Sequence, residues 1–118
     1  MPRFVVLAHD SPDGRHWDFM FETGPALATW ALERPPESGQ VATAKALPDH
    51  RAAYLDYEGP ISRGRGSVVQ WDRGTCEIEE RSANRIVLVL SGKKLSGRAM
   101  LTRSTDDPQC WRFLFTPD

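Results

Sequence analysis

Apolar residues in this chain recur at every second position, which is the side-chain repeat of a β-strand. The clearest example begins at Trp17, where Trp17, Phe19 and Phe21 are separated by Asp18 and Met20. A helix would instead repeat its apolar positions about every 3.6 residues. The alternation therefore predicts a fold made mostly of β-strands.

Further strand-like stretches are separated by turn sequences rich in Gly, Pro, Asp and Asn. The stretches cover residues 4–8, 17–22, 26–32, 40–47, 67–71, 75–79, 85–90, 98–103 and 110–115. The stretch 26–32 is also compatible with a short helix, because its apolar spacing is ambiguous. We expect a compact closed or nearly closed β-barrel of about eight strands, with a sandwich as the alternative.

Two segments predict local structure other than a plain strand. The sequence Asp-Arg-Gly at residues 72–74 predicts a hairpin turn, because Gly74 can adopt a positive φ. Residues 49–55 predict the one short helix of the fold, with Asp49 as its N-cap.

Length and composition set limits on the class of protein. The chain has 118 residues, and we expect residues 1–118 to form a single domain without a linker or repeat. Fifteen basic and sixteen acidic residues nearly cancel, so binding to nucleic acid would need a local basic face. Cys76 and Cys110 are interpreted as reduced thiols, and no secretory leader or membrane-length apolar run is evident. We therefore expect a cytoplasmic monomer without a membrane segment.

His16 and Asp18 stand two positions apart on an expected strand, so both side chains point to one face. His9 ends the preceding strand, and antiparallel pairing would bring it beside them. Two imidazoles and one carboxylate can hold a catalytic divalent metal with positions left for water and substrate. These mixed donors suit manganese, iron, zinc or cobalt better than calcium. His and Asp are also common in turns, so an ordinary structural role stays open.

Two further features could contact phosphate, although each also has an ordinary interpretation. His50 stands at the start of the expected helix, where an anion is favoured and an imidazole can transfer a proton. Spacing alone favours an exposed histidine without a ligand. Arg63 and Arg65 lie on a Gly-containing loop, where their guanidinium groups can bind phosphate or remain solvated.

Several segments together resemble one known family, in the same order along nearly the whole chain. They read FVVLAHD, HWDF, WA, DH, YLDYEG, GRGSV, WDRGT and GKKLSGR, and they lie at residues 4–10, 16–19, 30–31, 49–50, 54–59, 64–68, 71–75 and 92–98, with the strand around Trp111 completing the set. The family is the 3′-phosphoesterase domain of bacterial ligase D-type DNA repair enzymes. The ligase and polymerase domains of those enzymes are absent, so the resemblance implies a free-standing version.

The resemblance implies a compact β-barrel that binds manganese, or else zinc or cobalt. It implies a DNA-repair hydrolase that trims 3′ ends of DNA or RNA, removing a terminal ribonucleotide or a 3′-phosphate to leave a 3′-hydroxyl. By position, His9, His16 and Asp18 match the metal ligands of the family. His50 matches the histidine that contacts the scissile phosphate, and Tyr54 matches an active-site tyrosine. A separate ligase or polymerase is the implied partner.

Some positions depart from the pattern of this family. The spacing between His9 and His16 is one residue longer than usual. Polar or charged residues of the family are replaced by Leu7, Met20, Ala42 and Pro48. Arg34 replaces a lysine, and Lys45 could substitute for the arginine lost at position 42. The metal set is therefore complete, whereas the phosphate-binding set is reduced and is assigned to Arg34, Lys45, Arg63 and Arg65.

Two other functions stay open at this point. A catalytically weakened module that binds nucleic-acid ends or a repair partner without turnover would explain the lost charged positions. A small-molecule metalloenzyme with a cupin-like barrel pocket is the third interpretation. It has less support, because the pair His16 and Asp18 lacks the clustered His and Glu ligands that such barrels usually supply.

Overall fold

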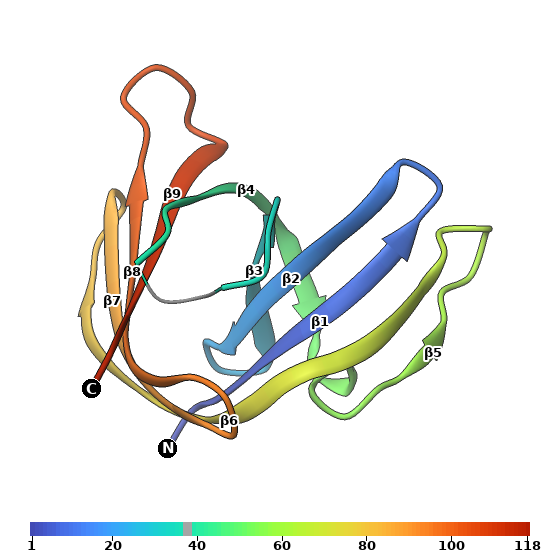
Figure 1. The fold of residues 1–118 in the computed structure, drawn as a ribbon, viewed down its shortest axis with the longest axis horizontal. Coiled ribbons are helices and arrows are strands. Elements are labelled where there is room, and N and C mark those ends of the chain that lie inside the picture. The colour runs from blue at the N-terminus through green and yellow to red at the C-terminus, as the bar shows by residue number, and fades with distance from the viewer. Residues whose placement is uncertain (37–38) are drawn as a thin grey trace.

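The strands form one antiparallel sheet that closes on itself in a computed structural model, which describes residues 1–36 and 39–118. The order in the sheet is β1-β2-β3-β4-β9-β8-β7-β6-β5, and β1 also pairs with β6, so eight of the nine described strands form a ring (Figure 1). The predicted barrel is therefore confirmed. The elements are β1 (Arg3–Ser11), β2 (Gly14–Glu22), β3 (Ala26–Leu32), β4 (Ala42–Arg51), the 3₁₀ helix η1 (Ala52–Leu55), β5 (Gly59–Pro60), β6 (Ser67–Arg81), β7 (Arg85–Gly92), β8 (Ser96–Arg103) and β9 (Cys110–Pro117).

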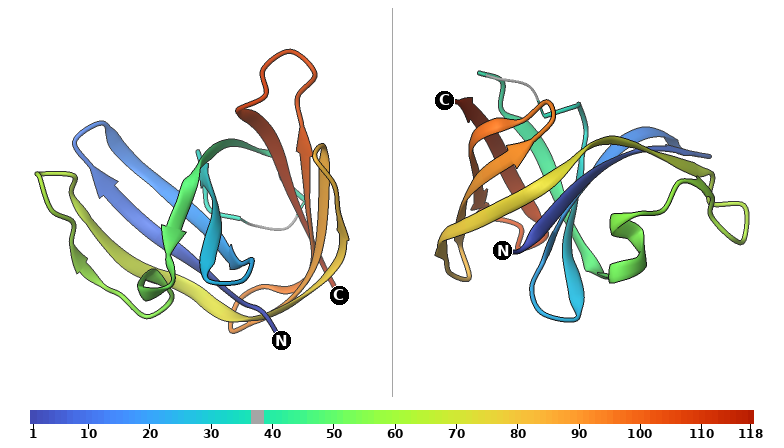
Figure 2. Two further views of the ribbon diagram at one scale, coloured as in Figure 1. Left: turned by 180° about the vertical axis from the view of Figure 1, so that it is seen from behind. Right: turned by 90° about the horizontal axis from the view of Figure 1, so that it is seen from below.

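The ring has two apolar layers, because alternate side chains of its strands point inward and outward. The inner layer is the main core and is rich in aromatic residues, among them Phe4, Phe19, Phe21, Trp30 and Phe113. The outer layer is a smaller cluster made of Val5, Leu7, Met20, Leu27, Leu55 and Val68. The helix η1 and strand β5 lie outside the ring beside this smaller cluster (Figure 2).

The hairpin predicted at residues 72–74 is wrong, because β6 continues through this segment as one strand (Figure 1). The first part of β6 pairs with β1 and the second part pairs with β7. Gly74 serves close approach of two backbones and not a turn: a Cβ there would lie 2.1 Å from the carbonyl oxygen of Ser91.

The predicted helix is shorter than expected and begins later. β4 stays paired with β3 as far as Arg51, which faces Ala26, so Asp49 and His50 belong to a strand. The single helical turn covers Ala52–Leu55, and Arg51, not Asp49, occupies its N-cap position without a side-chain cap. The ambiguous stretch 26–32 is the strand β3.

Asp72 is a buried carboxylate that ties β6 to the turn between β7 and β8. Its side chain accepts hydrogen bonds from the backbone N–H groups of Lys93, Lys94 and Leu95, at 2.9, 3.1 and 2.8 Å. Only 3% of its surface is exposed, so these three donors replace water as its solvation.

The two cysteines are free thiols in the structure, as expected from the sequence. Burial raises the pKa of the Cys76 thiol to about 11, which keeps it protonated at neutral pH. Among the described residues, no helix is long and apolar enough to cross a membrane.

We predict that Asp72→Ala lowers the free energy of unfolding by about 2–4 kcal/mol, because it leaves three buried N–H donors without an acceptor. Asp72→Asn should lower the free energy of unfolding by less, because its amide oxygen can still accept a hydrogen bond. Urea denaturation measures both changes. The control Asp106→Ala, at an exposed turn position, should change stability by less than about 0.5 kcal/mol. An equal loss of stability in Asp72→Ala and in the control would show that the three hydrogen bonds to Asp72 do not stabilise the fold.

Candidate metal centre and adjoining cavity

The register between β1 and β2 brings His9, His16 and Asp18 together. His9 lies directly opposite His16, and Asp18 is two residues further along β2 on the same face. The two imidazole rings have their centroids 4.4 Å apart. One ligand atom from each of the three residues lies within 4.8 Å of the others. The cluster stands on the outer face of the barrel, next to the smaller apolar layer.

The Asp18 carboxylate is 3% exposed and lies between the two histidines. Its Oδ2 is 3.0 Å from His9 Nδ1, and its Oδ1 is 3.0 Å from His16 Nε2. The second contact lacks hydrogen-bond geometry, so Oδ1 is buried without a hydrogen-bond partner among the described residues. The carboxylate raises the pKa of His16, against the opposing effect of burial. A buried carboxylate with a free oxygen next to two imidazoles is suited to bind a cation.

His9 has an acceptor next to each ring nitrogen. Nδ1 lies 3.0 Å from Asp18 Oδ2, and Nε2 lies 2.8 Å from the backbone carbonyl oxygen of Arg65. A neutral imidazole carries one N–H, so it can donate to only one of the two oxygens. If Nε2–H donates to the carbonyl, Nδ1 directs its lone pair toward the carboxylate. Histidines that bind metals typically use their second nitrogen in this way, so the donor set fits a divalent ion.

Gly66 explains how the Arg65 carbonyl reaches His9. Gly66 has a φ of +94°, and a Cβ there would lie 1.7 Å from the carbonyl oxygen of Asp10. Only glycine allows this approach, which lets the chain enter β6 with Ser67 opposite Asp10. The Gly-containing loop therefore contributes a backbone carbonyl group to the site in addition to its charged side chains.

A small cavity of about 60 Å³ connects two of the three candidate ligands, His9 and Asp18, to other predicted site residues. Its lining consists of Leu7, His9, Asp18, Met20, His50, Tyr54, Ile61, Arg65 and Val68. His50 is far from His9 in sequence, and the sheet brings both to one cavity. The floor includes the buried side chains of Leu7 and Met20, which belong to the smaller apolar layer.

His50 is oriented by its own strand. Its Nδ1 is 2.9 Å from the carbonyl oxygen of Pro48, so Nδ1–H donates there and Nε2 stays available for a ligand. The His50 ring packs edge-on against Tyr54, with centroids 5.5 Å apart. Pro48 replaces a glutamate of the resembled family, yet its backbone still positions His50.

The four predicted phosphate-binding residues occupy different places. Arg65 lines the cavity, and its guanidinium donates to the carbonyl and the hydroxyl oxygen of Ser62, at 2.9 and 3.2 Å. Arg63 lies in the exposed turn before it, with a φ of 64°, and is not part of the cavity lining.

The other two lie further from the cavity. Arg34 follows β3, where it donates to Gln40 at 3.2 Å and pairs with Glu33 at 3.7 Å. Lys45 is exposed on β4, in register with Ala31, which is itself opposite Asp18. Lys45 is therefore two strands from the metal cluster on the same face. Ala42 is buried inside the barrel, so that position offers no charge to a substrate.

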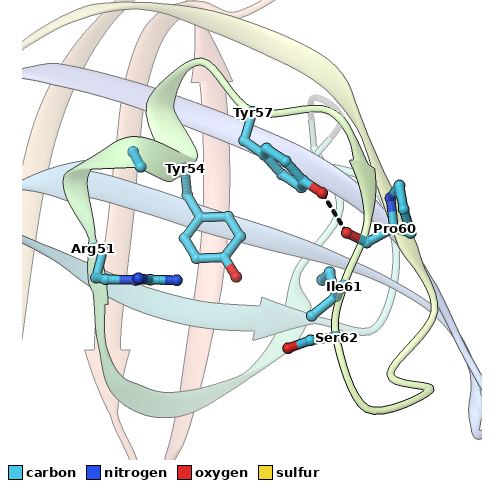
Figure 3. Close-up of a pocket in the computed structure, with 7 residues that line it drawn as sticks. Arg51, Tyr54, Tyr57, Pro60, Ile61 and Ser62 are labelled. Atoms are coloured by element: carbon cyan, nitrogen blue, oxygen red, sulfur yellow. Dashed lines mark hydrogen bonds between the residues drawn. The ribbon is translucent and has the colours of Figure 1, made fainter.

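Arg51 and Tyr57 were not predicted as site residues, although Tyr57 lies in the matching segment 54–59. They line a second, wider cleft of about 260 Å³ with Tyr54, Ile61 and other residues. Figure 3 shows Arg51 and Tyr54 on one side of this cleft and Ile61 on the other. The fold of the segment after β4 brings Arg51 and Tyr57 to the same cleft, and no local sequence pattern predicts this.

We predict that Gly66→Ala weakens Mn²⁺ binding by about 10- to 100-fold, because the added Cβ displaces the Arg65 carbonyl from His9. Gly64→Ala is a matched control: Gly64 also has a positive φ, of +66°, but a Cβ there would meet no atom within 4 Å. Isothermal titration calorimetry measures both affinities. Equal weakening in the two variants would mean that backbone strain, and not the carbonyl contact, is responsible.

The comparison with known proteins identifies the family to which the chain belongs. Residues 7–103 match the family model described as the DNA ligase D 3′-phosphoesterase domain. The multifunctional non-homologous end joining protein LigD of Pseudomonas aeruginosa is 33% identical in an alignment of 112 positions, which covers 86% of this chain and 13% of that protein. LigD of Mycobacterium tuberculosis is 31% identical in an alignment of 113 positions, which covers 88% of this chain and 15% of that protein. The chain thus spans a small part of these relatives, and it belongs to the family of DNA ligase D 3′-phosphoesterase domains.

Proposed function

We propose that this chain is a divalent-metal-dependent phosphoesterase that trims 3′ ends of DNA or RNA during DNA repair. It would remove a terminal ribonucleotide or a 3′-phosphate and leave a 3′-hydroxyl. The observation that carries the proposal is the single cavity shared by two of the three candidate ligands, His9 and Asp18, and by His50. Membership of a 3′-phosphoesterase family supports the same reaction class. The relatives named above give no support to the small-molecule alternative.

In this proposal, His9, His16 and Asp18 hold the metal, for which manganese is the first choice and zinc or cobalt are alternatives. The bound ion would supply positive charge that polarises a phosphate oxygen. The Arg65 carbonyl orients His9, and the buried position of Asp18 keeps its carboxylate free of bulk water.

The remaining residues act on the phosphate itself. His50 Nε2 faces no protein acceptor among the described residues. When the imidazole is protonated, Nε2–H can donate a hydrogen bond to a phosphate oxygen or a proton to the leaving oxygen. Tyr54 packs against His50 and limits its rotation. The Arg65 guanidinium, held by Ser62, supplies a second positive group at the cavity. Arg34, Lys45 and Arg63 would contact the nucleic-acid backbone further out.

A binding module without turnover is the second candidate, and the cavity floor favours it. Leu7 and Met20 are fully buried and apolar at positions where the family usually has polar groups. Fewer groups therefore hold the phosphate in the transition state than the family pattern would supply. A module of this kind would bind 3′ ends with a steep salt dependence and release no product.

The decisive experiment incubates the protein with a primer–template that ends in a 3′-phosphate, with Mn²⁺ or with a chelator. We expect phosphate release with Mn²⁺ and none with the chelator. Salt-sensitive binding without release would favour the binding module. Under the leading proposal a separate ligase or polymerase uses the 3′-hydroxyl product, and the chain acts as a cytoplasmic monomer.

We predict that substitutions of the candidate ligands lower metal binding, whereas substitution of His50 lowers turnover alone. His16→Ala and Asp18→Asn should lower bound Mn²⁺, measured by mass spectrometry of the metal content. His50→Gln should keep the metal and lower kcat by about 10²- to 10⁴-fold, because it removes proton transfer. Asp106→Ala, an exposed change outside the site, should alter neither quantity. Loss of metal in His50→Gln would contradict the division of roles.

A further inference from the structure

We propose that the cleft lined by Arg51, Tyr54, Tyr57 and Ile61 binds the base of the nucleoside that carries the 3′-phosphate. This inference rests on the proposed function, because it places the phosphate in the metal cavity. The cleft has a volume of about 260 Å³ and adjoins that cavity, since Tyr54 and Ile61 line both. A phosphate at the metal would therefore have its nucleoside at the mouth of the cleft.

The cleft offers an aromatic surface next to the phosphate position. His50, Tyr54 and Tyr57 form a chain of edge-on ring contacts, with centroid distances of 5.5 Å and 5.8 Å. Tyr57 is 36% exposed, which is unusual for a large apolar side chain in this protein. Bases stack on exposed aromatic rings without regard to sequence, because every base has a π-face. The cleft thus suits any base at a broken 3′ end.

Tyr57 is held in position before any ligand binds. Its hydroxyl donates a hydrogen bond to the carbonyl oxygen of Pro60 on β5, which pairs with β6 (Figure 3). Gly59 has a φ of +135°, and a Cβ there would lie 3.2 Å from the Tyr57 hydroxyl. Glycine at this position therefore leaves room for the Tyr57 hydroxyl at the wall of the cleft. A ring that is already fixed loses little freedom when a base stacks on it.

The charge around the cleft is compatible with a nucleotide. The side chain of Arg51 is exposed and forms no side-chain hydrogen bond or ion pair with the part of the chain that the structure describes. The nearby acid Asp56 is already paired with Arg3 at 2.7 Å and with Arg73 at 3.6 Å. Glu58 accepts a hydrogen bond from the backbone N–H of Gln70. Arg51 therefore remains available for the phosphate that precedes the stacked base.

The test measures the affinity of oligonucleotides that end in a slowly hydrolysed 3′-phosphorothioate, by fluorescence anisotropy with Mn²⁺ present. One oligonucleotide has a normal terminal base, and the other has an abasic terminal nucleotide. We expect Tyr57→Ala to bind the normal end about tenfold more weakly and the abasic end as tightly as the unmodified protein does. Tyr57→Phe keeps the ring but loses the hydrogen bond to Pro60, so it should bind the normal end more tightly than Tyr57→Ala does.

Val69→Ala is the matched control, because Val69 is 57% exposed on β6 and lines neither the cavity nor the cleft. Equal weakening of both ends in Tyr57→Ala, or no weakening of either, would overturn the inference. Phosphate release from a normal 3′-phosphate end is measured separately. Absent release with base-dependent binding would reject the phosphoesterase but keep the base site. Phosphate release without base-dependent binding would support the phosphoesterase and reject the base site.

Discussion

The antiparallel register between β1 and β2 is the constraint on which both the core and the candidate site depend. It sets His9 opposite His16 and Leu7 opposite Asp18 on the outer face. The same register directs Phe4 and its inward neighbours into the main core. A slip of one residue would exchange the two faces, exposing aromatic rings and burying imidazoles inside the barrel. The burial of the core therefore also holds the three candidate ligands in position.

Closure of the ring adds the second half of the site. Because β1 also pairs with β6, the loop before Ser67 is brought against the end of β1, where Gly66 permits close contact with Asp10. This contact places the Arg65 carbonyl on His9. In an open sheet, His9 Nε2 would contact water, and no backbone carbonyl group would select the tautomer of His9. Barrel closure thus sets the hydrogen-bond partner of one candidate ligand, His9, as well as the shape of the fold.

Local sequence patterns predicted the features that depend on the alternation of side chains along a strand. They did not predict features that depend on contacts between distant segments. The strands and the proximity of His9, His16 and Asp18 follow from period two and a short turn. Gly74 was assigned to a hairpin because a sequence does not show whether glycine serves a turn or a close backbone approach.

The segment around His50 shows the same limit. Asp49 resembled a helix cap, but pairing with β3 extends the strand to Arg51. The cavity that joins His50 to His9 forms between segments about forty residues apart in the chain, so no local spacing could predict it. The resemblance to a family implies contact between His50 and the phosphate, and the structure shows that Nδ1 of His50 faces the carbonyl oxygen of Pro48.

The charge of the cavity argues for a cation as part of its working state. Asp18 is buried there and would repel a phosphate dianion, and the apolar side chains of Leu7 and Met20 give no compensation. Arg65 is exposed to solvent, which weakens its effect by screening. A divalent ion held between Asp18 and the histidines would reverse the sign of the field that a phosphate meets. In the proposed function, the phosphate would therefore be held mainly by this ion, because few other groups of the cavity could hold it.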